Sequence, residues 1–291
     1  VISNPEFLRE GEALRDFRFP DRIIIGSNDK KVFNIMRKLY YPLINKGAKF
    51  LTTTRRGAEL IKYASNAFLA TKITFINELA NLCEKSNINI EDISLGMGSD
   101  SRIGSRFLRA GPAYGGSCFP KDTKGLVSVA EKNKINLSLV KSVIKSNHDR
   151  INLLTSRIHK ILGKNLKNKK ISFLGVTFKP NTDDMRDSTS LKMIPYLCKK
   201  GAFVNYYDPS GEKKEFAKIK NCFFQSKIEK NCKNTDLIIL LTEWDEFKTI
   251  DFKRIVKNNK FKIYDLRNLY NPKDMKLNNI EYFSIGRQNS N

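Results

Sequence analysis

The second half of the chain alternates short apolar strands with helices, and this alternation restricts its fold more than any other feature. Four strands are expected from apolar runs, at 171–178, 202–209, 236–244 and 261–267. Helical patterns at 188–199 and 251–258 lie between them. Strands that alternate with helices form parallel βαβ units. We therefore predict a doubly wound parallel sheet, whose ligands would bind beyond the carboxyl ends of the strands.

Upstream of this half lies a periodic segment of about thirty residues, 57–86, which predicts an unusually long helix. Its apolar residues cover most of the helix circumference, so we expect it to be buried on several sides and to form a dimer contact. Lys62 and Asn66 interrupt the apolar pattern four residues apart and therefore project from one face. An exposed helix edge is the alternative explanation for this pair. Further helices are expected at 91–98, 122–133 and 138–162.

The start of the chain has the pattern of a partial domain. A short strand is expected at 1–8 and a second at 20–27, followed by a helix over 29–46 and an extended stretch at 50–54. Because the first strand has no partner before it, we expect the chain to begin partway through a larger domain. The sequence G-x-G-x-x-G between a strand and a helix, typical of dinucleotide-binding domains, does not occur in the chain.

The composition is that of a soluble globular protein, with 40% hydrophobic and 29% charged residues. No apolar run reaches the roughly 18 residues of a membrane span. The five cysteines are irregularly spaced and the two histidines lie near none of them in sequence. We therefore expect neither a metal site nor a disulfide framework, and we favour a reduced, cytoplasmic compartment.

The formal net charge of +23 leaves several classes of partner open. It is compatible with nucleic acid, an anionic lipid surface or an anionic small substrate. The basic residues are scattered among polar neighbours, and no basic region carries the aromatic stacking residues of RNA-binding folds. A coding bias toward lysine, asparagine and isoleucine would produce the same charge. We therefore favour a solvated surface and keep a basic nucleic-acid-binding α/β protein as an alternative class.

The clearest chemical pattern is GPAYGGSCFPKD at 111–122. Its two adjacent glycines allow a tight turn and the close approach of a ligand to the backbone. Cys118 follows them at the expected start of a helix, where the helix N-terminus and Lys121 would both favour its thiolate. A lone cysteine is usually a small buried hydrophobic residue, but these neighbours favour a nucleophile. No histidine lies nearby in sequence to act as its base, which argues against a papain-like protease.

Five segments, in this order, resemble the UDP-glucose/GDP-mannose dehydrogenase family and together span nearly the whole chain. They are NPEFLREG (4–11), Lys62 to Asn66 with AFLATK (67–72), SRIGSRFL (101–108), GPAYGGSCFPKD (111–122) and LGVTFKPNTDDMRDS (174–188). Ala113 departs from the pattern, since the family usually has glycine there. Gly11 after Glu10 favours UDP-glucose as substrate, and GDP-mannose is the alternative within the family.

The resemblance implies three domains. Residues 1–54 would be the end of an amino-terminal Rossmann domain that binds NAD, and most of that domain would be missing. Residues 55–165 would form a central helical dimerisation domain, and residues 166–291 a Rossmann-like domain that binds the UDP-sugar. We expect a homodimer through the long helix, with no nucleic-acid or membrane partner. We also expect the chain as given to be an incomplete enzyme, or a silent fragment that keeps dimerisation and sugar binding.

The implied reaction is the four-electron oxidation of UDP-glucose to UDP-glucuronate with two NAD+. By resemblance, Cys118 would form a thiohemiacetal and then a thioester, which water hydrolyses. Lys62 and Asn66 would supply a cation and an amide to developing oxyanions, and Asp122 and Glu6 would activate water.

The same resemblance assigns the binding residues. Contacts to NAD would come from Glu10, Lys121 and Arg186. Arg102 would reach across the dimer interface into the neighbouring site. The contacts to the UDP-sugar would come from Glu6, Phe7, Leu8, Arg9, Lys62, Asn66, Arg102, Phe107, Leu108, Arg109, Ala110, Gly111, Tyr114, Gly115, Lys179 and Arg267.

Overall fold

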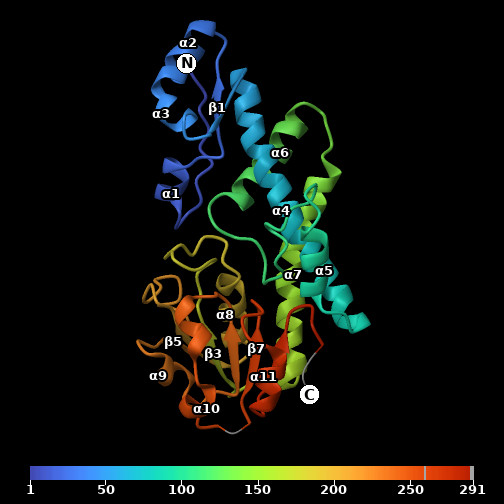
Figure 1. Ribbon diagram of the computed structural model, residues 1–291. Coiled ribbons are helices and arrows are strands. Elements are labelled where there is room, and N and C mark those ends of the chain that lie inside the picture. Colours follow the sequence, from blue (N-terminus) through green and yellow to red (C-terminus); the bar gives the residue numbers. More distant parts are fainter. Residues whose placement is uncertain (259, 289–291) are drawn as a thin grey trace. The chain divides into compact units, whose positions relative to one another are not determined.

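The computed structural model describes residues 1–258 and 260–288 (Figure 1). The contacts within the chain divide it into two compact units. We call Val1–Phe68 with Lys121–Leu137 the amino-terminal unit, and Leu69–Pro120 with Ser138–Asn291 the carboxyl-terminal unit. The helices α4 (Arg55–Ser86) and α6 (Phe119–Lys132) contain residues of both units. The three domain ranges expected from the sequence stay predictions.

The carboxyl-terminal unit contains a six-stranded parallel sheet. Its strands are β3 (Lys170–Leu174), β4 (Phe203–Tyr207), β5 (Cys222–Phe224), β6 (Leu237–Leu240), β7 (Lys262–Asp265) and β8 (Glu281–Ser284). They are ordered β5-β4-β3-β6-β7-β8, so the chain runs outward from β3 in one direction and then in the other. This order confirms the predicted doubly wound sheet. The strands β5 and β8 were not expected, and β3 ends four residues before the predicted end at 178.

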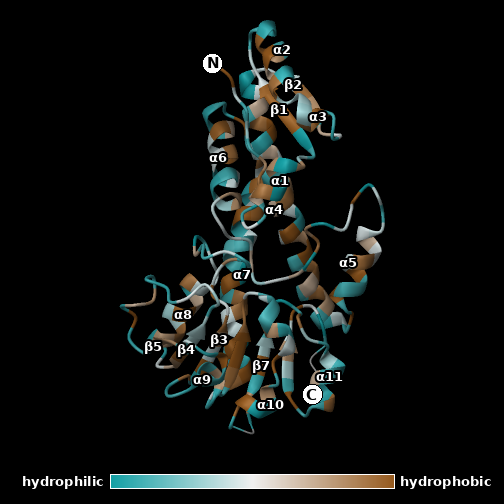
Figure 2. Ribbon diagram, turned by 60° about the vertical axis from the view of Figure 1, so that its left-hand side comes forward, coloured by the Kyte–Doolittle hydropathy of each residue, from teal (hydrophilic) through white to brown (hydrophobic). Residues whose placement is uncertain are grey.

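Helices cover both faces of this sheet (Figure 1). They are α7 (Ser138–Leu162), α8 (Ser190–Lys199), α9 (Ile228–Cys232), the 3-10 helix η1 (Asp245–Thr249), α10 (Phe252–Ile255) and α11 (Pro272–Leu277). The same unit also contains α5 (Ile90–Gly98), which comes before these helices in the chain. Alternate strand residues enter two separate cores. Ile171 and Phe173 join the core that includes α7 and α8, while Ile238 and Leu240 join the core that includes η1 and α10. The central strand β6 accordingly consists of apolar residues alone, and apolar strand segments are brown in Figure 2.

The helix α4 has 32 residues, which confirms the long helix expected over 57–86. Its buried side includes Ala70, Ile76 and Ala80, while Phe75 and Leu82 are exposed large apolar residues. Part of the apolar surface of this helix is therefore not buried by other residues of the chain. The described helices include none that is long and apolar enough to cross a membrane.

The amino-terminal unit contains two parallel strands with helices between and around them. Its elements, besides parts of α4 and α6, are α1 (Ala13–Arg18), β1 (Arg22–Gly26), α2 (Lys30–Leu39), α3 (Tyr41–Ile44) and β2 (Lys49–Thr53). The helix expected over 29–46 is interrupted, because Pro42 cannot donate a backbone hydrogen bond to the preceding turn. The strand expected at 1–8 is reduced to an isolated bridge between Ser3 and Gly26.

Candidate functional site

The loop of Cys118 comprises residues 99–118, which connect the end of α5 to the first residue of α6. The Cys118 side chain is partly exposed, and its Sγ lies 3.5 Å from the hydroxyl oxygen of Ser117. The ring of Phe119 makes edge contacts with Phe107 and Tyr114, at centroid distances of 6.0 and 6.1 Å. These contacts link Phe107 and Tyr114 of the loop to the residue that follows Cys118.

The loop lies directly against the segment that follows β3. A Cβ atom on Gly115 would come within 2.5 Å of the carbonyl oxygen of Asp187, and one on Gly116 within 2.7 Å of the Phe178 ring. The amide of Gly116 donates a hydrogen bond of 2.8 Å to the carbonyl oxygen of Arg186. Both glycines are therefore needed for this close approach.

Replacing Gly116 with alanine is expected to lower the free energy of unfolding by more than the cost of placing a side chain on a left-handed backbone, because the added Cβ also meets the Phe178 ring. Gly116 has φ +80°, which costs a residue with a Cβ about 1–2 kcal/mol, and the contact with Phe178 adds about 1–3 kcal/mol. Gly163→Ala is the matched control, since Gly163 has φ +93° and no atom within 4 Å of its Cβ position. Urea denaturation of both variants measures the difference. Equal losses of unfolding free energy would contradict the packing described here.

Arg267, which follows β7, hydrogen-bonds to residues that follow β6 and β3. Its Nε donates to the carbonyl oxygen of Leu241 at 2.8 Å, and its Nη2 donates to that of Phe178 at 3.0 Å. The carboxylate of Glu243 lies 2.9 Å from Nε. Arg109, on the loop of Cys118, donates from Nη2 to the carbonyl oxygen of Arg267 at 3.2 Å. The loop therefore meets the carboxyl edge of the sheet at Arg267.

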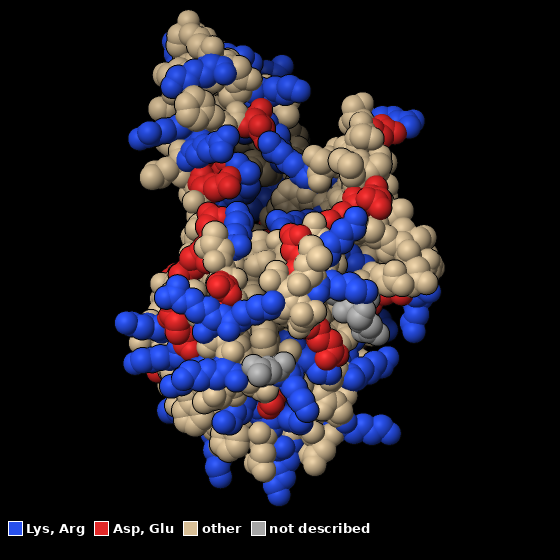
Figure 3. Space-filling view, turned by 60° about the horizontal axis from the view of Figure 1, so that its bottom comes forward, with Lys and Arg blue, Asp and Glu red and all other residues tan. Residues whose placement is uncertain are grey.

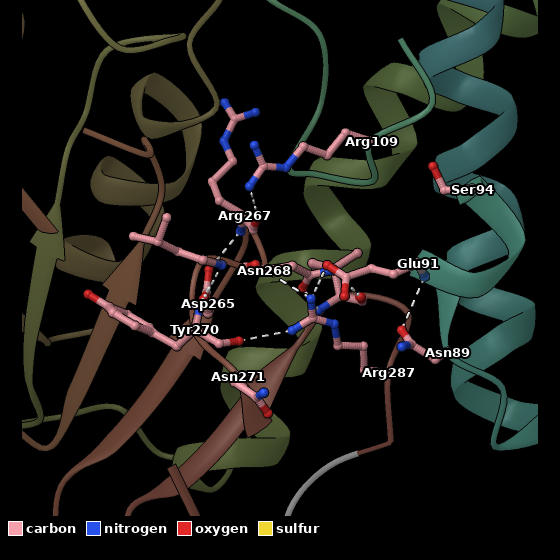
Figure 4. Close-up of polar contacts among 12 residues, drawn as sticks. Asn89, Glu91, Ser94, Arg109, Asp265, Arg267, Asn268, Tyr270, Asn271 and Arg287 are labelled. Carbon is pink, nitrogen blue, oxygen red and sulfur yellow. Dashed lines mark hydrogen bonds and ion pairs between the residues drawn. The ribbon is translucent and has the colours of Figure 1, made fainter. Parts of the chain in front are cut away.

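A buried carboxylate fixes the backbone on which Arg267 stands. Asp265 accepts hydrogen bonds from the amides of Arg267, Leu269 and Tyr270 and from the hydroxyl of Tyr282. Burial raises the pKa of Asp265, and these four hydrogen bonds act against that rise. The turn after β7 is thus held in one conformation (Figure 4).

Further cations lie on the segment that packs against the loop of Cys118. The Lys179 ammonium lies 5.5 Å from the centroid of the Phe178 ring. Arg186 forms an ion pair with Asp184 at 2.9 Å, with its own side chain 65% exposed. Lys179, Arg186 and Arg267 are cationic neighbours of the loop that can contact a phosphorylated ligand. The same segment also carries the carboxylates of Asp183, Asp184 and Asp187.

In the amino-terminal unit, Lys62 and Asn66 each contact a carboxylate. The Lys62 Nζ lies 2.5 Å from Oε1 of Glu6, and Asn66 Nδ2 donates to Oδ2 of Asp122 at 2.6 Å. Burial raises the pKa of Glu6, but the hydrogen bonds from Lys62 and from the Leu8 amide outweigh it, so its pKa is lowered. Glu6 is therefore a carboxylate at neutral pH.

The same unit contains a cavity of about 660 Å³. Lys62, Lys121 and Asp122 line it together with Arg55, Arg56 and residues near the start of the chain. Asp122 is fully buried, and the Lys121 ammonium lies 3.3 Å from its Oδ1. The cavity combines four cationic side chains with two carboxylates, the buried Asp122 and the exposed Glu59, a combination that can hold an anionic ligand and move a proton. In the part of the chain that the structure describes, no cluster of side chains suits a metal ion.

The remaining residues expected from the sequence are more dispersed. Arg9 pairs with Asp16, and the Phe7 ring lies under the guanidinium of Arg22. Leu8 has an exposed side chain and Glu10 is half-buried, while the exposed Arg102 pairs with Asp100 at 2.6 Å. The side chains of Leu108 and Ala110 are buried in the protein, so these two positions can offer a ligand only their backbone. All of these ligand contacts stay predictions.

Three residues that contact the loop of Cys118 were missed by sequence reasoning. Asn77, Asn147 and Arg150 hydrogen-bond to the backbone of Gly111 or Tyr114. The sequence gives little indication of their role, because polar residues are common on amphipathic helices and most of them face solvent. Asn77 does interrupt the apolar pattern of 57–86, as Lys62 and Asn66 do.

Family models cover most of the chain. Those of the UDP-glucose/GDP-mannose dehydrogenase family match residues 56–149 with the central domain, 172–272 with the UDP binding domain and 1–44 with the NAD binding domain. The last match corrects one expectation: the chain does carry sequence of the NAD binding domain, so it is wrong to describe that domain as lacking.

Curated relatives and a solved structure agree with the family models. The chain is 47% identical to the UDP-glucose 6-dehydrogenase of Rickettsia felis and 46% identical to that of Rickettsia prowazekii, over 98% and 99% of its length. It spans 64% and 67% of the lengths of these two proteins. A UDP-glucose dehydrogenase structure from the archaeon Pyrobaculum islandicum matches with a TM-score of 0.88 and 31% identity, covering 99% of this chain and 63% of that one. The chain belongs to the UDP-glucose/GDP-mannose dehydrogenase family.

Proposed function

We propose that the protein takes part in the NAD-dependent oxidation of UDP-glucose to UDP-glucuronate through Cys118. The supporting observation is the placement of Cys118 on a glycine loop that packs against residues 178–187, which include Lys179 and Arg186, and meets Arg267. Relatives that are 46–47% identical are UDP-glucose 6-dehydrogenases, which favours UDP-glucose over GDP-mannose.

In this proposal the thiolate of Cys118 adds to the aldehyde carbon formed from the C6 alcohol, giving a thiohemiacetal and, after the second oxidation, a thioester. Lys62 and Asn66 stabilise the oxyanions with an ammonium and an amide. Asp122, with Glu6, takes a proton from the water that attacks the thioester carbonyl. The carbon–sulfur bond then breaks, releasing the carboxylate and returning the thiolate.

The cavity of the amino-terminal unit fits NAD chemically, because Arg55, Arg56, Lys62 and Lys121 on its wall suit a pyrophosphate. We assign NAD contacts to Glu10, Lys121 and Arg186. When bound, NAD+ supplies the hydride acceptor for both oxidations.

We further propose a homodimer through α4. Phe68, Phe75 and Leu82 are exposed on this helix at seven-residue intervals, so they form one apolar stripe. Arg102, whose side chain is 87% exposed, is available to reach a second copy. The cysteines found in the described structure are free, which suits a reducing compartment such as the cytoplasm.

The high positive charge does not favour a separate nucleic-acid function. On the face in Figure 3, Lys and Arg are interspersed with Asp, Glu and uncharged residues instead of forming one stripe. Such a mixed distribution is typical of a solvated surface.

The proposed substrate can be tested by protection of Cys118. We expect UDP-glucose at ten times its Kd to slow alkylation of Cys118 by iodoacetamide about tenfold, because only the free site reacts. Peptide mass spectrometry reports each cysteine separately, so the alkylation of Cys118 is followed apart from that of the other cysteines. GDP-mannose at the same concentration is expected not to protect. Equal protection by both sugar nucleotides would refute the sugar assignment, and no protection by either would refute the site.

A further inference from the structure

We propose that Asn77, Asn147 and Arg150 are positioning residues that hold the loop of Cys118 in the shape that binds the nucleotide sugar. We call these three residues the loop clamp. The inference rests on the proposed function, because it concerns the same binding loop. It adds residues that act only through the backbone of that loop.

Asn147, on α7, pairs with both backbone groups of Tyr114. Its Oδ1 accepts a hydrogen bond of 2.9 Å from the amide, and its Nδ2 donates one of 3.0 Å to the carbonyl oxygen. This two-point contact resembles the pairing of neighbouring strands, so it fixes the direction of the loop at Tyr114 as well as its position.

Gly111, three residues earlier, is held in the same way by two side chains. Its amide donates to Asn77 Oδ1 at 2.8 Å, and its carbonyl oxygen accepts from Arg150 Nε at 2.7 Å. Arg150 Nη1 also donates to the backbone carbonyl oxygen of Asn77 at 3.1 Å, which joins the Arg150 side chain to the backbone of α4. The loop is therefore held at two points by residues of α4 and α7.

The cost of burying these groups indicates a role beyond helix packing. Asn77 and Arg150 are 3% and 5% exposed, and burial lowers the pKa of Arg150 to about 10, so it stays charged at neutral pH. An apolar side chain of similar size would pack α4 against α7 without burying a charge. Two of the hydrogen bonds that compensate this burial go to the backbone of Gly111 and hold the loop, while Arg150 makes its other hydrogen bonds to Asn77 and Asn81 on α4.

The clamped residues border the two chemical parts of the site. Tyr114 packs on Phe119, the residue that follows Cys118. A Cβ on Gly111 would lie 3.3 Å from Nη1 of Arg267. Release of the clamp would therefore loosen the loop between the thiol and the arginine at the sheet edge.

The test compares three variants of the whole chain. Asn147→Ala removes both hydrogen bonds to Tyr114, and Asn147→Asp replaces the donor with a carboxylate oxygen that faces a carbonyl oxygen. Thr155→Val is the matched control. Thr155 lies on the same helix, is 7% exposed and donates a hydrogen bond of 2.7 Å to the carbonyl oxygen of Ile151, so its replacement removes a hydrogen bond within the helix and none to the loop. Amide hydrogen exchange of the peptide spanning 107–117 reports the loop, and calorimetric titration with UDP reports the site.

We expect both Asn147 variants to exchange the loop amides at least about tenfold faster than the wild type at pH 7.5 and to bind UDP at least about tenfold more weakly. Thr155→Val should lower the melting temperature without either effect. At pH 5 the Asn147→Asp protein should move toward wild-type loop exchange, since a protonated carboxyl regains a donor for the Tyr114 carbonyl oxygen.

The possible failures are distinguishable. Unchanged loop exchange in both Asn147 variants would overturn the clamp. Faster loop exchange with unchanged UDP affinity would show a structural role only and would overturn the positioning role, leaving the proposed function intact. A wild-type chain that does not bind UDP would count against the proposed function, while loop exchange would still decide whether Asn147 holds the loop.

Discussion

Replacing Cys118 with serine is expected to lower the rate of UDP-glucuronate formation by the active enzyme at least about 10³-fold. A serine hydroxyl is almost entirely protonated at neutral pH, and no histidine in the chain lies near Cys118 in sequence to activate it. Formation of the acyl intermediate therefore stops. UDP-glucose affinity should change less than about threefold, because only one sulfur atom is exchanged for oxygen.

The measurement is chromatographic quantification of UDP-glucuronate, with binding of UDP-glucose followed by calorimetry. Cys222→Ser is the control, since Cys222 is also partly exposed but lies on β5. Serine at 118 with wild-type turnover would eliminate covalent catalysis by this residue. Loss of UDP-glucose binding in Cys118→Ser would instead assign the sulfur a role in binding.

The sequence predicted the order of the large elements because hydrophobic periodicity records burial. The apolar strand segments at 171–174 and 237–240 are buried on both faces, so their patterns are strong. The predicted strand at 171–178 was too long because its apolar run continues past Leu174, whereas Gly175 turns with φ +75°. A Cβ there would lie 2.5 Å from the Cβ of Thr242, a contact that periodicity does not record.

The two missed strands have weaker patterns for a physical reason. In β5, Phe223 is 49% exposed, and the strand has only three residues. In β8, Tyr282 and Phe283 belong to the cores on opposite faces of the sheet, in a strand of only four residues. Such short segments become strands because a neighbouring strand offers hydrogen bonds, and this tertiary effect is absent from the local sequence.

The candidate site was predictable where side chains carry the chemistry and unpredictable where the backbone does. Cys118 and its flanking glycines form a distinctive sequence pattern. The loop clamp has none, because Asn147 and Arg150 recognise amides and carbonyl oxygens that every residue possesses. Their partners could be identified only after α7 had been placed beside the loop.

Replacing Asp122 with asparagine is expected to slow turnover about 10²–10⁴-fold by removing the base that activates the hydrolytic water. Asp122 is fully buried and accepts a hydrogen bond of 2.6 Å from Asn66, and the carboxamide oxygen of an asparagine can accept the same bond. The fold should therefore persist while the base is lost. Formation of the thioester precedes this step, so the acyl group should accumulate on Cys118.

Mass spectrometry of the peptide containing Cys118 detects this intermediate, and a rapid burst of two NADH per site should precede slow turnover. Asp149→Asn is the control, because Asp149 is an exposed carboxylate that pairs with Lys145 on α7. Normal turnover of Asp122→Asn together with acyl accumulation in Glu6→Gln would transfer the role of base to Glu6, whose pKa is already lowered by Lys62 despite its burial. Slow turnover of Asp122→Asn without an adduct would place the residue before thioester formation, which contradicts its assignment to hydrolysis.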